Sequence, residues 1–457
     1  LLERRLVREL EGGTYTFSHD SIREVTYGGL SNARRQILHH RVARSQMALA
    51  VGSSSSAAAI ARHLEQAGLL EGAIPYYRVA AQHALALCAG SEAVLHLEKA
   101  IELVKRVPES APRQVQEIEL RTALCVALIG LEMYSGPRML QEYERVRTLC
   151  ESAGMTPGPA ALRTLALALI MTGEIAEAED IGRRLLASAG TGANPVLSVE
   201  ARYVLGIAAY WQGDPAGAVA HLGAAITSYR TERAPEHLDT FGQDPGPICG
   251  IRLAQALWTV GRTAEALEAV ADALARAGAI TQPHTLAYLH QWAAWTLIDL
   301  GDEAGARQQV DRAIAVADAN ALPGWSIRNR ALHGFLLGRE GQLGPGIELM
   351  ERAAAEWSAR RYRLAVPYDR ALRAQICLAA GRVEDGLRAI EEGAAIAAAT
   401  GQCFWDAELL RLRGELVAAA GGRAMEVRLL LGEAVAVATR QGAIALARRA
   451  QESLGRV

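Results

Sequence analysis

Lysine is almost absent from this chain of 457 residues. Lys99 and Lys105 are the two lysines, so nearly all of the positive charge comes from arginine. A P-loop needs lysine followed by serine or threonine after a glycine-rich turn, because the ammonium group must reach the nucleotide phosphates. Lys99 follows Glu98 and Lys105 follows Val104, so neither stands in such a turn. The sequence therefore excludes a P-loop within these residues.

Cysteine, excess charge and long apolar runs are also scarce. The 6 cysteines stand singly without a Cys-x-x-Cys pair, which excludes a zinc ribbon or disulfide framework and favours a reducing cytoplasm. The net charge of -2 argues against nucleic-acid binding, because phosphate contacts need an excess of basic residues. No apolar run reaches the length of a transmembrane helix. The first residues contain neither an initiator methionine nor a signal peptide, so we expect a piece of a longer protein.

Glycine, in contrast, recurs at a regular spacing. Seven glycines are separated by 40, 48, 40, 40, 40 and 40 residues: Gly173, Gly213, Gly261, Gly301, Gly341, Gly381 and Gly421. A small residue stands seven positions before each of them: Ala166, Gly206, Ala254, Ala294, Gly334, Ala374 and Gly414. Another stands five positions after all but the last: Ala178, Ala218, Ala266, Ala306, Gly346 and Gly386. This pattern predicts two antiparallel helices per repeat, with a left-handed glycine ending the first helix and small residues allowing close packing. Such hairpins must stack to bury their apolar stripes.

The order and spacing of these residues resemble the tetratricopeptide repeat. The period of 40 residues exceeds the roughly 34 of that family, and the proline that usually ends the second helix is missing. Both departures imply longer helices. We therefore expect an all-α fold, with a right-handed tetratricopeptide-like superhelix over residues 157–457 and divergent helical hairpins over residues 53–156. A non-repetitive helical bundle is the alternative.

One repeat is 48 rather than 40 residues long, and its extra residues lie within positions 231–250. This stretch contains three prolines and three glycines, which predict a loop without a helix. An inserted loop in a solenoid is a candidate binding loop. A tolerated surface insertion is the alternative.

The N-terminal residues 1–52 have a different pattern. The apolar pair Leu6-Val7, a turn at residues 11–13 and the run Thr14–Phe17 predict a β-hairpin. Ser21 and Glu24 then form a capping box that would begin a helix. Residues 32–49 predict a basic amphipathic helix.

Residues 15–43, YTFSHDSIREVTYGGLSNARRQILHHRVA, resemble the junction between a winged helix and a helical arm in signal-transducing ATPases of the STAND class. Residues 241–267 resemble the helical arm of cyclase-linked members of that class. The resemblance implies an upstream module that binds ATP or ADP, an output domain for transcription regulation or nucleotide cyclisation, and oligomerisation on activation. It also implies that His19 senses the nucleotide in the ADP-loaded resting state and that Asp20 orients the following helix. Alternatively, Asp20 and Ser21 only cap that helix and His19 packs against the hairpin.

No catalytic or metal-binding motif occurs, so we expect neither an enzyme nor a bound cofactor within this chain. The repeat resemblance places the first helix of each hairpin along a concave groove. Aromatic and arginine side chains there would suit a peptide or a small molecule, although aromatic residues also fill gaps between alanine-rich helices. The candidate groove residues are Tyr203, Tyr210, Trp211, Trp258, Tyr288, Gln291, Trp295, Asp299, Arg328, Phe335, Arg339 and Tyr368.

Together these patterns predict the regulatory repeat arm of a multidomain bacterial signalling ATPase in the cytoplasm. The arm would bind a partner protein or a small inducer in its groove and thereby control nucleotide-dependent activation. We expect no direct contact of this region with nucleic acid or membrane. The alternative is a stand-alone tetratricopeptide scaffold for protein–protein interaction.

Overall fold

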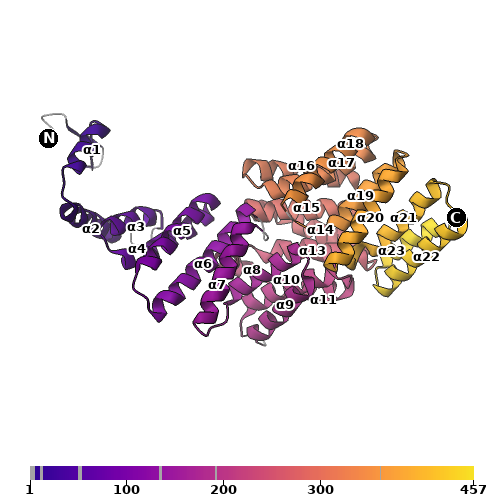
Figure 1. Cartoon of the computed structure of the whole chain (residues 1–457), viewed down its shortest axis with the longest axis horizontal. Coiled ribbons are helices and arrows are strands. Elements are labelled where there is room, and N and C mark those ends of the chain that lie inside the picture. The colour runs from indigo at the N-terminus through magenta and orange to yellow at the C-terminus, as the bar shows by residue number, and fades with distance from the viewer. Residues whose placement is uncertain (1–5, 11–13, 50–53, 133–135, 191–192, 361) are drawn as a thin grey trace. The chain divides into compact units, whose positions relative to one another are not determined.

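The computed structural model describes residues 6–10, 14–49, 54–132, 136–190, 193–360 and 362–457 (Figure 1). The chain divides into two compact units, residues 1–121 and residues 122–457, which are treated separately below. The division falls inside helix α6 (Ala111–Glu132). The boundaries predicted after residues 52 and 156 stay predictions.

The first unit begins with the expected β-hairpin. Strands β1 (Val7–Leu10) and β2 (Thr14–Phe17) pair antiparallel, with Val7 opposite Phe17. The predicted turn at residues 11–13 lies outside the described residues. Helices follow as α1 (Asp20–Gly28), α2 (Asn32–Leu49), α3 (Ala57–Gln66), α4 (Leu70–Ala86), α5 (Gly90–Arg106) and the start of α6.

Two expectations for this unit are wrong in detail. Helix α1 begins at Asp20 with His19 as its N-cap residue, so Ser21 lies inside the first turn and does not cap the helix. The carbonyl of His19 accepts a hydrogen bond from the N–H of Ile22 at 3.1 Å. Helix α2 forms over the predicted residues but is not amphipathic, because its apolar residues are spread around the axis and its one buried residue among those described is Ala43.

The second unit is a stack of helical hairpins that follows the rest of α6 and α7 (Pro137–Ser152) (Figure 1). The first helices of the hairpins are α8 (Pro159–Thr172), α10 (Pro195–Trp211), α13 (Pro245–Thr259), α15 (Pro283–Leu300), α17 (Pro323–Arg339), α19 (Val366–Ala379) and α21 (Asp406–Ala419). Their partners are α9 (Ile175–Ala189), α11 (Pro215–Ser228), α14 (Thr263–Ala275), α16 (Glu303–Ala319), α18 (Leu343–Ala359), α20 (Val383–Thr400) and α22 (Ala424–Arg440). Helix α23 (Ile444–Leu454) packs against α21 and α22, and also against α13.

The repeat chemistry expected from the sequence is confirmed. All seven repeat glycines have a left-handed backbone, with φ between +69° at Gly381 and +103° at Gly173. Asp214 and Asp302 cap the following helices, each accepting a backbone hydrogen bond three residues later at 2.8 and 2.9 Å. Gly334 and Gly346 face each other so closely that a Cβ on Gly346 would lie 2.5 Å from the Gly334 carbonyl oxygen. Small residues thus set the distance between paired helices.

The prediction that residues 231–250 contain no helix is wrong. They form the short 3₁₀ helix η2 (Thr231–Arg233), the helix α12 (Ala234–Phe241) and the start of α13. Pro235 stands in the first turn of α12, and Pro245 begins α13. The N–H of a residue in the first helical turn has no partner within the helix, so proline is tolerated there. Proline also begins α8, α10, α15 and α17, a helix-start signal that the sequence analysis did not use.

The first helices carry the core of the second unit. In α13, 13 of 15 residues are buried, whereas its partner α14 buries three of 13. A helix that is buried on nearly every side must be covered on its groove face as well as on the face toward its partner. The inner side of the stack is therefore packed in this structure. The short 3₁₀ helices η3 (Ala277–Ala279) and η4 (Cys403–Trp405) lie in the connections from α14 to α15 and from α20 to α21. In the described part of the chain, no helix is both long and apolar enough to cross a membrane.

Candidate functional site

Aromatic side chains fill the interior of the second unit. The chain has 7 tryptophans, and all of them are buried in this unit: Trp211, Trp258, Trp292, Trp295, Trp325, Trp357 and Trp405. Trp295 stacks on Tyr368 with ring centroids 3.5 Å apart, and Trp211 meets the ring of Phe404 edge-on at 4.6 Å. These contacts join residues from α10, α15, α19 and η4, so the interior is held together by rings that are far apart in the sequence.

A cavity of about 50 Å³ remains at one side of this aromatic cluster. Its walls come from α8, α10, α13, α15, α17 and α18, and from residues 364–365 before α19. A water molecule needs about 10–15 Å³ of such space, so the cavity has room for roughly three to five waters. The walls are mostly apolar and aromatic, which is typical of small-molecule sites. The interior therefore contains a partly open apolar cavity beside the packed core.

Arg252 on α13 lines this cavity and is the most unusual group in it. Its side chain is buried, yet Nε and Nη2 have no hydrogen-bond partner among the described residues. Its guanidinium lies 3.9 Å from the ring centroid of Trp292, and 4.9 and 5.0 Å from those of Trp211 and Tyr210. Cation–π contacts of this kind offset part of the cost of burying a charge, but they leave the N–H donors unused.

Other residues that line this cavity also carry donors without a partner among the described residues. Arg328 on α17 forms an ion pair with Asp369 through Nη1, while its Nη2 has no partner among the described residues. The indole N–H groups of Trp211, Trp292 and Trp325, all of which line the cavity, are also unpartnered within the part of the chain that the structure describes. Buried polar groups normally have partners, so a cluster of unused donors around one cavity needs an explanation.

One wall of the cavity is a strained segment just before α19. Ala365 has a left-handed backbone with φ of +63°, a conformation that costs a non-glycine residue free energy. Gln402 holds this segment in place, because its Oε1 accepts from the Ala365 N–H at 2.7 Å and its Nε2 donates to the Arg363 carbonyl at 3.0 Å. The N–H groups of Arg363 and Leu364 also donate to the Met171 carbonyl on α8, each at 3.3 Å.

A buried ionic network supports the helices next to the cavity. Arg163 on α8 donates to Glu200 at 2.9 Å and to Gln243 at 2.8 Å, and Glu200 lies 2.7 Å from His237 of α12. Burial lowers the pKa of the nearby His284 to about 4, with a further contribution from the positive charge of Arg163. Helix α12 is therefore linked to α8 and α10 by a buried network of the Arg163–Glu200 ion pair and the His237–Glu200 contact.

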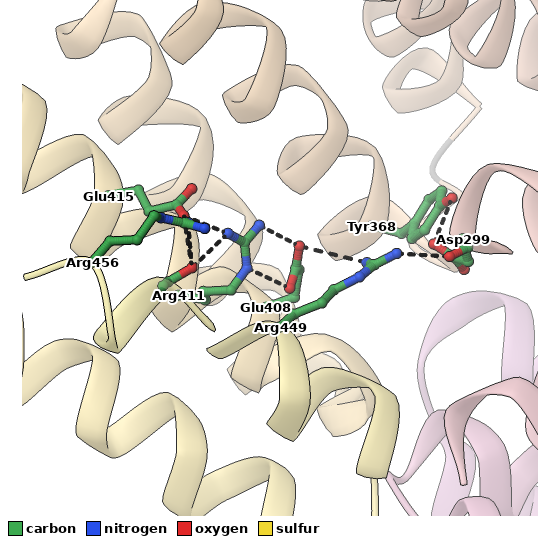
Figure 2. Close-up of polar contacts among 8 residues, drawn as sticks. Asp299, Tyr368, Glu408, Arg411, Glu415, Arg449 and Arg456 are labelled. Carbon is green, nitrogen blue, oxygen red and sulfur yellow. Dashed lines mark hydrogen bonds and ion pairs between the residues drawn. The ribbon is translucent and has the colours of Figure 1, made fainter. Parts of the chain in front are cut away.

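A second polar network joins α15, α19, α21 and α23 and contains the predicted residue Asp299 (Figure 2). Burial raises the pKa of Asp299 to about 8, and the positive charge of Arg449 on α23 partly opposes this shift. Arg449 donates to the Asp299 carbonyl at 2.8 Å and lies 3.8 Å from Glu408. Glu408 in turn accepts from Arg411 at 2.7 and 2.9 Å. Figure 2 shows this chain of contacts continuing to Glu415 and Arg456.

The structure places the sequence-predicted groove residues in three settings. Five of them line the cavity: Tyr203, Trp211, Tyr288, Gln291 and Arg328. Six others are buried in the surrounding core: Tyr210, Trp258, Trp295, Asp299, Phe335 and Tyr368. Arg339 alone is exposed, and it pairs with Glu303 at 2.6 Å. His19 and Asp20 are exposed in the first unit. Ligand binding by any of these residues stays a prediction.

Arg252 is not among the predicted groove residues, although the repeat pattern contains a signal for it. Nine positions before the repeat glycines, the other six repeats carry Thr164, Val204, Trp292, Leu332, Leu372 and Leu412, and all of these are buried. The third repeat has Arg252 at this position. Arg252 therefore places a charge at a position where the other repeats bury an uncharged side chain. Such a departure lowers stability and is typical of a functional position. No three His, Cys, Asp or Glu side chains converge as metal ligands in the described residues.

Comparison with known proteins shows the fold and leaves the family open. No protein-family model matches the chain. An uncharacterized curated protein of Rhizobium meliloti is 25% identical over 449 residues, which cover 96% of this chain and 43% of that protein. The chain thus spans less than half of the length of this relative.

Among solved structures, a Rap protein complexed with competence and sporulation factor is similar, with a TM-score of 0.54 and 12% identity over 83% of this chain and 99% of that one. A STAND protein with a tetratricopeptide repeat sensor from Pyrococcus horikoshii gives a TM-score of 0.42 and 14% identity, covering 95% of this chain and 56% of that one. The expected all-α, tetratricopeptide-like solenoid is confirmed.

Proposed function

We propose that this chain is the sensor arm of a longer signal-transducing ATPase, and that the interior of its second unit binds the signal. The observation that carries this proposal is the cavity that is lined by buried aromatic rings and by Arg252, whose Nε and Nη2 have no partner among the described residues. Helical-repeat solenoids are typically binding modules, and a ligand enclosed between successive repeats contacts several of them at once. Such a ligand can shift the arm between two states if it prefers one of them.

The ATPase part of the proposal is supported by the N-terminal unit. Its β-hairpin, α1 and α2 follow one another in the order expected for the junction between a winged helix and a helical arm. The Rhizobium meliloti relative is more than twice as long as its aligned stretch, which leaves room for further domains in that protein. In this proposal the nucleotide, ATP or ADP, is bound outside this chain, and the exposed His19 at the start of α1 contacts it.

The test uses the complete gene product. We expect it to contain a P-loop and to copurify with ADP, and we expect His19→Ala to lose the retained ADP. His40→Ala, at an exposed histidine of α2, is the matched control and should retain ADP. A gene product without a P-loop, or unchanged ADP retention in His19→Ala, would contradict this part of the proposal.

A stand-alone scaffold for protein interaction is the second candidate function. The similarity in fold to a Rap protein, which was solved in complex with competence and sporulation factor, favours it. In this structure, however, nearly all candidate groove side chains are buried, so a partner would have to bind elsewhere or open the interior. The sequence of the complete gene product distinguishes the sensor arm from the stand-alone scaffold, because a scaffold needs no P-loop.

A further inference from the structure

We infer that the cavity beside Arg252 is a binding site for a small organic carboxylate, which the guanidinium of Arg252 holds between the tryptophan rings that line the cavity. This inference rests on the proposed sensory role of the second unit and names the class of ligand that would be sensed. Four observations support it: a buried arginine without an acidic partner among the described residues, N–H donors likewise without a partner there, a mostly apolar lining and a small volume.

The charge of the site is the first step. The guanidinium of an arginine carries a positive charge in proteins. A buried charge is costly unless it is paired, and the carboxylates of the described residues form no ion pair with Arg252. The other buried arginines of this region do have such partners, since Arg163 pairs with Glu200 and Arg328 with Asp369. The cavity therefore carries one uncompensated positive charge, which favours an anion.

The donors define the chemistry of the anion. A guanidinium offers N–H groups in a planar fork that matches the two oxygens of a carboxylate. Nε and Nη2 of Arg252, which are the unpartnered donors, lie on one edge of that fork. Trp211, Trp292 and Trp325 line the same cavity, and their indole N–H groups also have no partner among the described residues. An oxyanion can accept hydrogen bonds from such donors, whereas a cation can accept none.

The walls and the volume define the rest of the ligand. Leu167, Ile170, Met171, Ile207 and Leu364 present apolar surface to the cavity, which favours an organic anion over a fully hydrated inorganic one. A volume of about 50 Å³ corresponds to about three to five non-hydrogen atoms, judged by the space that waters occupy. Propionate has this size and one carboxylate, so it is a suitable probe. A ligand so small binds no tighter than the low micromolar range.

The experiment titrates the full chain with propionate and, separately, with propionamide, the neutral molecule of the same shape. Tryptophan fluorescence reports binding directly, because every tryptophan of the chain lies in the interior of the second unit. Calorimetry provides an independent dissociation constant, and sodium chloride at equal ionic strength controls for salt. We expect saturable binding of propionate and at least about tenfold weaker binding of propionamide, because a charge-assisted hydrogen bond is lost.

Variants locate the site. Arg252→Met removes the charge while keeping a long apolar side chain, and we expect it to weaken propionate binding at least about tenfold. Arg252→Lys keeps the charge without the planar fork and should give an intermediate loss. Arg312→Met, at an exposed arginine of α16, is the matched control and should bind as the wild type does.

Three results would overturn the inference: equal binding of propionate and propionamide, no effect of Arg252→Met, or binding of inorganic phosphate in place of propionate. None of these results bears on ADP retention by the complete gene product. A failure of the carboxylate site is therefore distinguishable from a failure of the proposed ATPase link.

Discussion

Removing the charge of Arg252 should stabilise the protein in the absence of ligand, which is unusual for a substitution at a buried position. Arg252 is 1% exposed, and its Nε and Nη2 atoms have no partner among the described residues. The burial of an unpaired ion costs several kcal/mol. Methionine fills a similar volume with apolar atoms and adapts to irregular gaps. Arg252→Met therefore removes a cost without opening a large cavity.

The expected magnitude follows from the rings around the guanidinium. The contact with Trp292 at 3.9 Å is worth about 2 kcal/mol when desolvated, and the contacts near 5 Å with Trp211 and Tyr210 are worth about 0.5–1 kcal/mol each. These contacts offset only part of a desolvation cost of several kcal/mol. We therefore expect the free energy of unfolding to rise by about 1–3 kcal/mol. With a urea slope of about 3 kcal/mol per M, the midpoint rises by roughly 0.3–1 M.

The assay is urea unfolding followed by tryptophan fluorescence, which reports on the second unit alone because all tryptophans lie there. Arg163→Met is the matched comparison, since it removes a buried arginine that is paired with Glu200. That variant removes the arginine partner of the buried Glu200 carboxylate, which then keeps its contact with His237, and it should lose about 3–5 kcal/mol. A lowered or unchanged midpoint in Arg252→Met would refute the reasoning, because Arg252 would then stabilise the fold.

Three further predictions concern the fold around the site. The pKa of Asp299 is raised to about 8, so the folded protein holds this proton while the unfolded chain releases it near pH 4. The free energy of unfolding therefore falls as the pH rises from about 4 to about 8. Asp299→Asn should raise the thermal midpoint at pH 9 while changing it little at pH 4. Equal shifts of the midpoint at both pH values would contradict the raised pKa of Asp299. Ala365→Gly should stabilise by about 1 kcal/mol in urea unfolding, because glycine adopts the left-handed backbone without strain, and a destabilised variant would show that the methyl group packs usefully. Gly346→Ala should destabilise by about 1–3 kcal/mol, because the new Cβ would lie 2.5 Å from the Gly334 carbonyl oxygen, and a wild-type midpoint would show that α17 and α18 can separate at no cost.

Much of the fold follows from local rules that the sequence displays directly. The repeat glycines end first helices because they adopt positive φ, and Asp214 and Asp302 begin second helices because their carboxylates accept backbone hydrogen bonds. These interactions involve residues within one turn of each other, so their spacing is visible without a structure. The insertion was misjudged because proline was treated as a helix breaker, whereas Pro235 and Pro245 stand in first turns, where proline is tolerated.

The candidate site depended on information that spacing does not contain. The register placed Tyr203, Trp211 and Tyr288 on the inner side, and the structure brings these three residues to one cavity. It did not predict that residues 363–365 would lie against α8, because that contact joins segments about 190 residues apart. It also did not predict which arginines have acidic partners, since Arg163 meets a glutamate from another helix while Arg252 does not. The contact of residues 363–365 with α8 and the acidic partner of each arginine both depend on packing between segments that are distant in the sequence.

The most direct test of the account is a crystal structure of the full chain grown with propionate. The account predicts electron density for the ligand in the cavity, with its two carboxylate oxygens within hydrogen-bond distance of Nε and Nη2 of Arg252 and its alkyl end against the apolar wall. A cavity that contains only water, or propionate bound at another place, would contradict the central claim that the repeats enclose a carboxylate site.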